Sequence, residues 1–254
     1  MNRAAGALVA AVVILLVATA GLALADSFVG TSGDDVLTGT VAPDQIYGDD
    51  GNDTINGRAG NDYLEGDTGN DTITAGPGAD LVIGGTGDDH IDGGQGVDVV
   101  YAGAGNDTVL GGSGNDILLG QAGDDRIFGG EGDDRIYALD QDFVDGGAGN
   151  DRITAQDGAS TLNGGAGDDA ITADNDSANV TVDSGAGNDR IATGAGDDTI
   201  TGGKGIDVIY SGGGNDTIDV ADGQHDTVYC GPGHDTVAAD RGDVLRNCEV
   251  RKRG

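Results

Sequence analysis

An aspartate recurs every nine residues, without a break, from Asp35 to Asp134. A helix repeats its side-chain directions every 3.6 residues and a strand every two, so neither needs a carboxylate at this interval. Self-similarity at a short fixed period is typical of repeat architectures, in which each unit is stacked on the next. The period therefore predicts a stack of equivalent turns, each presenting one carboxylate at the same place.

The repeating unit reads G-G-x-G-[ND]-D-x-U-x, where U is aliphatic, and the segment 111–119 is a clean copy. Glycines at positions 1, 2 and 4 permit positive φ and close backbone approach. Positions 7 to 9 alternate around the aliphatic residue, which predicts a three-residue strand with one side chain pointing inward. The expected inward residues are Leu37, Ile46, Ile55, Leu64, Ile73, Val82, Ile91, Val100, Val109, Leu118, Ile127 and Ile136.

Composition limits the function classes. The formal net charge of −33 excludes nucleic acid as a plausible partner, because binding phosphates requires neutralisation by Lys and Arg. Acidity with 4% aromatic residues would normally indicate disorder, but the strict period argues against it. No nucleophile elbow, zinc-protease helix or phosphate-binding loop is present in the sequence, so we expect a protein that is not an enzyme.

The repeat strongly resembles the RTX (repeats-in-toxin) nonapeptide family. The resemblance implies an all-β, calcium-binding parallel β-roll, a two-sheeted solenoid with two nonapeptide turns per coil. It also implies several Ca²⁺ ions between turns on the same edge, held by hard carboxylate and carbonyl oxygens. The implied carboxylate ligands are Asp35, Asp53, Asp62, Asp71, Asp80, Asp89, Asp98, Asp107, Asp116, Asp125, Asp134, Asp151, Asp169, Asp189, Asp198, Asp207, Asp216, Asp226 and Asp235. The implied carbonyl ligands belong to Gly48, Gly51, Gly57, Gly60, Gly66, Gly69, Gly84, Gly87, Gly93, Gly96, Gly111 and Gly114.

The expected roll spans residues 26–238, with irregular turns near 138–145 and 173–183. Ser160 replaces an aspartate, and Asp44 follows a turn without the usual glycines, so we expect weak binding at these places. One buried aliphatic side chain per nine residues is little compensation for ordering a glycine-rich backbone. Stacked carboxylates add repulsion, so we expect the chain to fold only as it binds calcium.

Both ends of the chain differ from the repeat. Residues 1–25 read as a secretory signal peptide with cleavage after Ala25, which predicts a secreted protein without stable membrane insertion; a retained membrane anchor is the alternative. Residues 239–254 leave the repeat and are expected to form a C-terminal cap with a basic tail. The tail could instead make an ionic contact with the acidic roll or a surface polymer.

Cys230 and Cys248 are separated by two repeat periods, which make one coil of a solenoid with two turns per coil. We therefore expect a disulfide, in keeping with an oxidising location. Free buried thiols and a cysteine metal site are the alternatives.

The two sheets are expected to differ on their outer faces. Counted from Asp35, all six tyrosines fall on even-numbered turns: Tyr47, Tyr63, Tyr101, Tyr137, Tyr210 and Tyr229. A contiguous apolar face usually marks an interaction surface, although strand propensity alone also favours such residues. Two function classes follow: a secreted calcium-binding repeat protein, or a calcium-dependent adhesin or matrix protein. The second would self-associate or bind a cell-surface partner through the Tyr47, Tyr63, Tyr101 and Tyr137 face or the basic tail.

Overall fold

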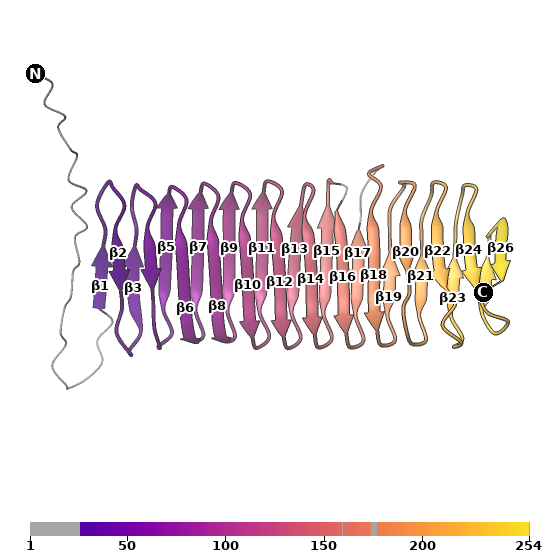
Figure 1. Cartoon of the computed structure of the whole chain (residues 1–254), viewed down its shortest axis with the longest axis horizontal. Coiled ribbons are helices and arrows are strands. Elements are labelled where there is room, and N and C mark those ends of the chain that lie inside the picture. The colour runs from indigo at the N-terminus through magenta and orange to yellow at the C-terminus, as the bar shows by residue number, and fades with distance from the viewer. Residues whose placement is uncertain (1–25, 159, 174–176, 254) are drawn as a thin grey trace, which may run out of the picture.

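The computed structural model describes residues 26–158, 160–173 and 177–253, so the predicted leader lies outside the described part of the chain. The described residues form strands β1 to β26 and no helix. The chain winds back and forth between two sheets and advances steadily along one axis, so that β1 and β26 lie at opposite ends of an elongated roll (Figure 1). Among these residues, no helix could serve as a membrane span.

Alternate strands belong to opposite sheets. Each sheet has 13 strands, and every strand pairs in parallel with the strand one coil away. The odd sheet contains β1 (Asp26–Val29), β3 (Asp44–Tyr47), β5 (Tyr63–Thr68), β7 (Leu81–Thr86), β9 (Val99–Ala104), β11 (Ile117–Ala122), β13 (Arg135–Leu139), β15 (Arg152–Gln156), β17 (Ala170–Ala173), β19 (Arg190–Ala192), β21 (Val208–Tyr210), β23 (Thr227–Tyr229) and β25 (Val244–Arg246). The even sheet contains β2 (Val36–Thr38), β4 (Thr54–Asn56), β6 (Thr72–Gly78), β8 (His90–Gly96), β10 (Thr108–Ser113), β12 (Arg126–Glu131), β14 (Phe143–Ala148), β16 (Thr161–Ala166), β18 (Thr181–Ala186), β20 (Thr199–Thr201), β22 (Thr217–Val220), β24 (Thr236–Ala239) and β26 (Val250–Arg253). The expected all-β parallel roll is confirmed.

The core is one row of aliphatic side chains from each sheet. In the regular coils, register partners are separated by two repeat periods, as in Ile73 with Ile91 and Leu118 with Ile136. All twelve residues predicted to point inward are at most 2% exposed. Alternation along each strand places their immediate neighbours outward, so each turn contributes one aliphatic side chain to the space between the sheets, joined in some coils by a small residue such as Ala75 or Ala102.

Both irregular segments are absorbed within single turns. The turn before β14 is one residue short, whereas the turn before β18 is longer than usual and still brings Thr161 into register with Thr181. Pairing continues through β14, β16, β18 and β20, so the roll is one continuous body across both segments. Tyr210 and Tyr229 lie on β21 and β23, so the prediction that all six tyrosines share one sheet is confirmed. This is the odd sheet, because the even-numbered turns counted from Asp35 lead into the odd-numbered strands.

The segment expected to form a cap contributes the last strand of each sheet, β25 and β26. The Cys230–Cys248 disulfide is present, with Cα atoms 5.2 Å apart, and it ties the turn after β23 to the segment before β26. Leu245 and Cys248 pack, partly buried, against the end of the core. The bridge therefore fastens the terminal coil where no further coil covers it.

Candidate metal centre

The turns form two edges of the roll, and each edge has a ladder of aspartates. We call the edge whose turns enter odd strands the odd edge and the other the even edge. On the odd edge, the amide of Asp98 donates to Oδ1 of Asp116 at 2.8 Å, and the amide of Asp116 donates to Oδ1 of Asp134 at 2.8 Å. The same bond, between aspartates one coil apart, recurs along both edges. One carboxylate oxygen per turn is thus used to hold adjacent coils.

The second carboxylate oxygen has no hydrogen-bond partner. Because a buried acceptor without a donor costs free energy, a regular column of such atoms requires an explanation. In the described residues this orphaned Oδ2 occurs in Asp53, Asp62, Asp71, Asp80, Asp89, Asp98, Asp107, Asp116, Asp125, Asp134, Asp142, Asp151, Asp169, Asp189, Asp198, Asp207, Asp216, Asp226 and Asp235. Asp35, at the start of the even edge, differs because the amide of Thr31 donates to its Oδ2.

Burial makes these carboxylates reluctant to ionise. Desolvation is the largest cause and raises the pKa of Asp98 to about 7, with the charges of Asp80 and Asp116 raising it further. The pKa of Asp134 rises to about 7 for the same reasons, next to Asp116 and Asp151. The amide bond from the preceding coil lowers each pKa and only partly offsets the burial. Without a positive charge nearby, the folded edges are electrostatically unfavourable at neutral pH.

In several turns with glycine at position 1, the space beside the orphaned oxygen is bordered by a second oxygen. A Cβ added to Gly111 would lie 2.8 Å from Oδ2 of Asp116 and 2.5 Å from the carbonyl oxygen of Gly129. At Gly93 the corresponding distances are 3.0 Å to Oδ2 of Asp98 and 2.6 Å to the carbonyl oxygen of Gly111. Glycine at position 1 therefore leaves open a cradle that contains one carboxylate oxygen and one carbonyl oxygen from the next coil.

Glycine at position 4 has a different role. Gly96 has φ of +136°, and a Cβ there would collide with the carbonyl oxygen of Gly78 in the preceding coil. Only glycine satisfies both the left-handed backbone and the close stacking. Among the predicted carbonyl ligands, the position-1 carbonyls, such as those of Gly66, Gly84 and Gly111, border the orphaned oxygens of the preceding coil. The position-4 carbonyls, such as those of Gly69 and Gly96, instead face the position-4 glycine one coil on.

The odd edge has a carboxylate in every turn from β3 to β25. Its members are Asp44, Asp62, Asp80, Asp98, Asp116, Asp134, Asp151, Asp169, Asp189, Asp207, Asp226 and Asp243. The even edge runs from Asp35 to Asp142 and resumes at Asp198. Between them the ladder positions hold Ser160 and Val180; the amide of Val180 still donates to Oδ1 of Asp198 at 2.9 Å. Ser160 and Val180 lie on consecutive coils of the even edge. The row of carboxylates on the even edge is therefore divided in two, whereas the row on the odd edge is continuous.

Three ladder residues were not among the predicted ligands. Asp142 accepts the amide of Asp125 and has an orphaned Oδ2, so the irregular turn predicted there is one residue short but keeps a ladder carboxylate. Asp243 accepts the amide of Asp226. Asp44 takes an ordinary place on the odd edge, although the amide of Thr40 donates to its Oδ2. Asp142 and Asp243 each complete a coil that is one residue short, so a search allowing a one-residue deletion per coil would have found both.

Carboxylates alone do not complete a site. Among the described residues, no three Asp, Glu, His or Cys side chains gather at one point as metal ligands. Backbone carbonyls are the other oxygens that could hold a cation, and turns with glycine at position 1, such as those at Gly93 and Gly111, offer one beside the ladder carboxylate. An all-oxygen set from flexible turns suits Ca²⁺, which accepts six to eight oxygen ligands without strict geometry.

The comparison with known protein families agrees with this chemistry. The family model described as "RTX calcium-binding nonapeptide repeat (4 copies)" matches residues 21–41, 29–64, 38–73, 74–109, 110–142, 145–178, 176–200 and 183–218. The chain belongs to the RTX calcium-binding nonapeptide repeat family. It is therefore a calcium-binding repeat protein with a parallel β-roll, and the Asp142 turn lies within a matched segment. No curated protein matches the chain.

Proposed function

We propose that this RTX protein is a secreted, non-enzymatic calcium-binding module that folds as it binds many Ca²⁺ ions along both edges. The observation that supports this most directly is the column of buried Oδ2 atoms without partners. When bound, Ca²⁺ would be held by the ladder aspartates and neighbouring backbone carbonyls and would supply the positive charge that these oxygens lack. Because the cradles exist only in the folded state, calcium stabilises the fold by mass action. Secretion is supported by the sequence of residues 1–25, which reads as a leader.

The test is a calcium titration of the metal-stripped mature chain at neutral pH. Far-UV circular dichroism should change from a disordered to a β spectrum as Ca²⁺ is added, and calorimetry should give several ions per chain. Mg²⁺ at the same concentration should not substitute, because it demands near-octahedral geometry and holds its water tightly. A β spectrum that is already complete in the stripped protein would contradict the proposal.

A matched pair of variants assigns the effect to the ladder. Asp116→Ala removes one orphaned carboxylate from the middle of the odd edge and should lower the calcium stoichiometry and the midpoint affinity. Asp183→Ala removes an exposed carboxylate from the outer face of β18 and should leave both unchanged. Equal effects of the two substitutions would show that total charge matters rather than the ladder.

A second candidate role, as a calcium-dependent interaction protein, is supported by the outer face of the odd sheet. Tyr47, Tyr63, Tyr101 and Tyr137 lie on β3, β5, β9 and β13 of this sheet and are partly or fully exposed. Aromatic side chains gathered on one flat surface are typical of contact surfaces.

A further inference from the structure

The outer face of the odd sheet has a continuous apolar centre. Register pairs Tyr63 with Leu81, Val99 and Ile117 in one column, and Ile83 with Tyr101, Leu119 and Tyr137 in the next. We call these eight residues of β5 to β13 the apolar patch. All are partly or fully exposed, and register neighbours are in contact distance across adjacent strands, so the patch is contiguous rather than scattered.

The outward side chains of the strands on this face have opposite charges towards its two ends. At the N-terminal end, Val29, Tyr47, Asp49, Glu65 and Asp67 line an acidic hollow. Towards the C-terminal end, Arg135, Arg152 and Arg190 lie in the same outward column on β13, β15 and β19. Two columns of outward side chains run along this sheet, one through Tyr63 and the other through Glu65 of β5. Among the described residues of these columns from β3 to β25, Glu65 is the sole acidic residue.

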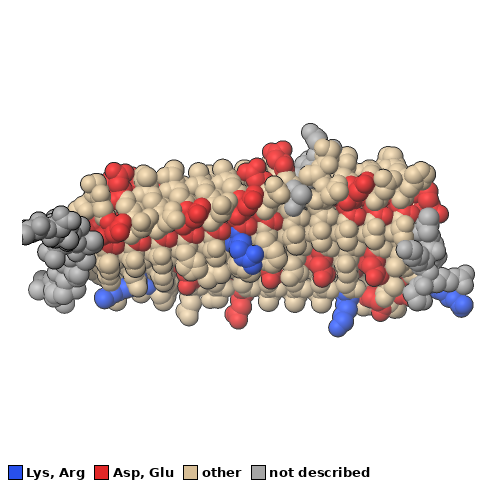
Figure 2. All heavy atoms as spheres, turned by 45° about the horizontal axis from the view of Figure 1, so that its top comes forward, with Lys and Arg blue, Asp and Glu red and all other residues tan. Residues whose placement is uncertain are grey.

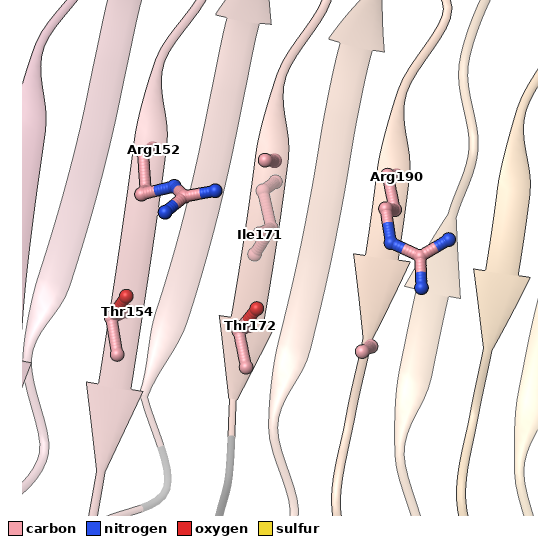
Figure 3. Close-up of a pocket in the computed structure, with 7 residues that line it drawn as sticks. Arg152, Thr154, Ile171, Thr172 and Arg190 are labelled. Carbon is pink, nitrogen blue, oxygen red and sulfur yellow. The ribbon is translucent and has the colours of Figure 1, made fainter.

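The arginine row has a groove in it. Arg152, Thr154, Ala170, Thr172, Arg190 and Ala192 line a shallow depression over β15, β17 and β19, together with Ile171 beneath (Figure 3). Figure 3 shows the Arg152 guanidinium extending from β15 across towards β17. Within the described residues, the guanidinium groups of Arg135 and Arg152 have no ion pair or hydrogen bond, although the two arginines are direct register partners. Asp133, Asp134, Asp151 and Asp168 line a hollow with Arg135 and Arg152 at the odd edge, but no ion pair joins them among the described residues. Both guanidinium groups therefore remain available to an anionic group from outside.

Along these outward columns, acidic, apolar and basic side chains follow one another. If a second copy is turned end to end, its basic side chains meet the acidic ones of the first and the apolar centres meet each other. We propose that the odd face is an interface between two copies of this chain, stacked antiparallel about a two-fold axis that runs along β9. This axis places β13 of one copy over β5 of the other, and β11 over β7. Arg135 then lies over Tyr63 and beside Glu65, while Leu119 meets Ile83 and Tyr101 meets its own copy. In the alternative two-fold stack, with both rolls pointing the same way, the arginine rows face each other, and like charges oppose association.

The size of the face sets the expected strength. Nine strands, β1 to β17, overlap in the antiparallel stack and span roughly 40 Å at about 4.8 Å per strand. With a width of about 10 Å, each copy buries a few hundred Å², which is below the roughly 800 Å² per partner of a stable complex. The dimer is therefore weak and sensitive to salt, with the charged ends deciding its orientation. The inference extends the interaction role proposed above and needs calcium only because calcium folds the roll.

Sedimentation velocity in calcium buffer tests the proposal. The wild-type chain should dimerise reversibly, and Arg135→Glu or Glu65→Arg alone should each weaken the dimer at least tenfold. The double variant Arg135→Glu with Glu65→Arg restores the pairing and should recover most of the affinity. Arg126→Glu, on the outer face of the even sheet, is the matched control and should have no effect. The dimer is overturned, and calcium binding left intact, if the wild-type chain is folded by circular dichroism but stays monomeric at hundreds of micromolar. Failure of the chain to fold in calcium overturns the proposed function instead.

A spin-label distance measurement tests the orientation. Both native cysteines are in the disulfide, so Gln45→Cys on β3 introduces the single reactive thiol. In the antiparallel stack the two labels lie six strand positions apart, or about 30 Å. Labels within about 10 Å of each other, the separation of two facing sheets, would establish the stack with both rolls in the same direction and overturn the proposed axis.

Discussion

The calcium-free chain should be folded in mild acid and unfolded at neutral pH. Burial raises the pKa of Asp89, Asp98, Asp125, Asp134, Asp169 and Asp207 to about 7 in the fold, from 3.8. The folded state therefore holds protons that the unfolded state has released, and stability falls as pH rises from about 4 towards 7. The stability that these bound protons contribute is fully present only at pH values below the pKa of aspartate in the unfolded chain.

The size of the effect follows from the same values. A pKa raised from 3.8 to about 7 corresponds to roughly 4 kcal/mol lost per carboxylate at high pH. Neighbouring ladder groups titrate together, so these losses are not additive. The loss from even one such group is a sizeable part of the about 5–15 kcal/mol that stabilises an ordinary domain. We therefore expect the fold without calcium to lose its net stability as the pH rises through about 7.

Circular dichroism of metal-stripped protein between pH 5 and 8 measures this directly, with light scattering to detect precipitation near the pI of about 4.1. The β signal should fade as pH rises and return at any pH in this range when calcium is added. Asp98→Asn removes one ladder charge and should move the unfolding midpoint to higher pH. Asp183→Asn, which removes an exposed charge on the outer face of β18, should not move it. A pH-independent β spectrum without calcium would refute the reasoning.

The remaining predictions concern stacking, the terminal coil and the divided edge. Gly96→Ala should destabilise the calcium-bound roll by about 3 kcal/mol or more in thermal unfolding, because φ is +136° and a Cβ meets backbone. Gly33→Ala, whose Cβ meets nothing within 4 Å, should change stability by less than about 0.5 kcal/mol. Cys248→Ser should remove roughly 3 kcal/mol from the terminal coil, detected as early loss of hydrogen-exchange protection in β23 to β26. Val180→Asp returns a carboxylate to the even edge beside Asp198. Calorimetry should then detect one more bound calcium, and the calcium-free protein should be less stable. An unchanged stoichiometry would show that a ladder carboxylate is insufficient for a site.

Charge is distributed unevenly over the roll, and this bears on both proposals. Figure 2 shows acidic side chains in rows along the roll, with lysines and arginines at only a few isolated points. The ladder aspartates themselves are buried, each at most 8% exposed, so they contribute little to this visible surface. The proposed calcium ions would neutralise the buried edges, while the surface charges would remain to set solubility and the orientation of a partner.

The sequence by itself determined the period, the strand that follows each ladder aspartate, the inward aliphatic row and the chemistry of the ligands. These features are local: a glycine at a left-handed position or an aliphatic residue in a three-residue strand has the same meaning in every copy. The placement of all tyrosines on one sheet was also predictable, because alternation between sheets requires only counting turns.

Only the tertiary structure decided which turns lack a ladder carboxylate. Asp142 keeps its place because a coil tolerates the loss of one residue when the strands on both sides stay in register. The losses at Ser160 and Val180 fall on one edge because consecutive turns alternate between edges. Val180 is identified as a ladder position only by its amide, which donates to Asp198 one coil on. The charge order along the odd face, from Glu65 to Arg135, likewise exists only after residues one coil apart become neighbours. Pairing between coils, rather than the repeat itself, therefore turns a periodic sequence into two distinct edges and two distinct faces.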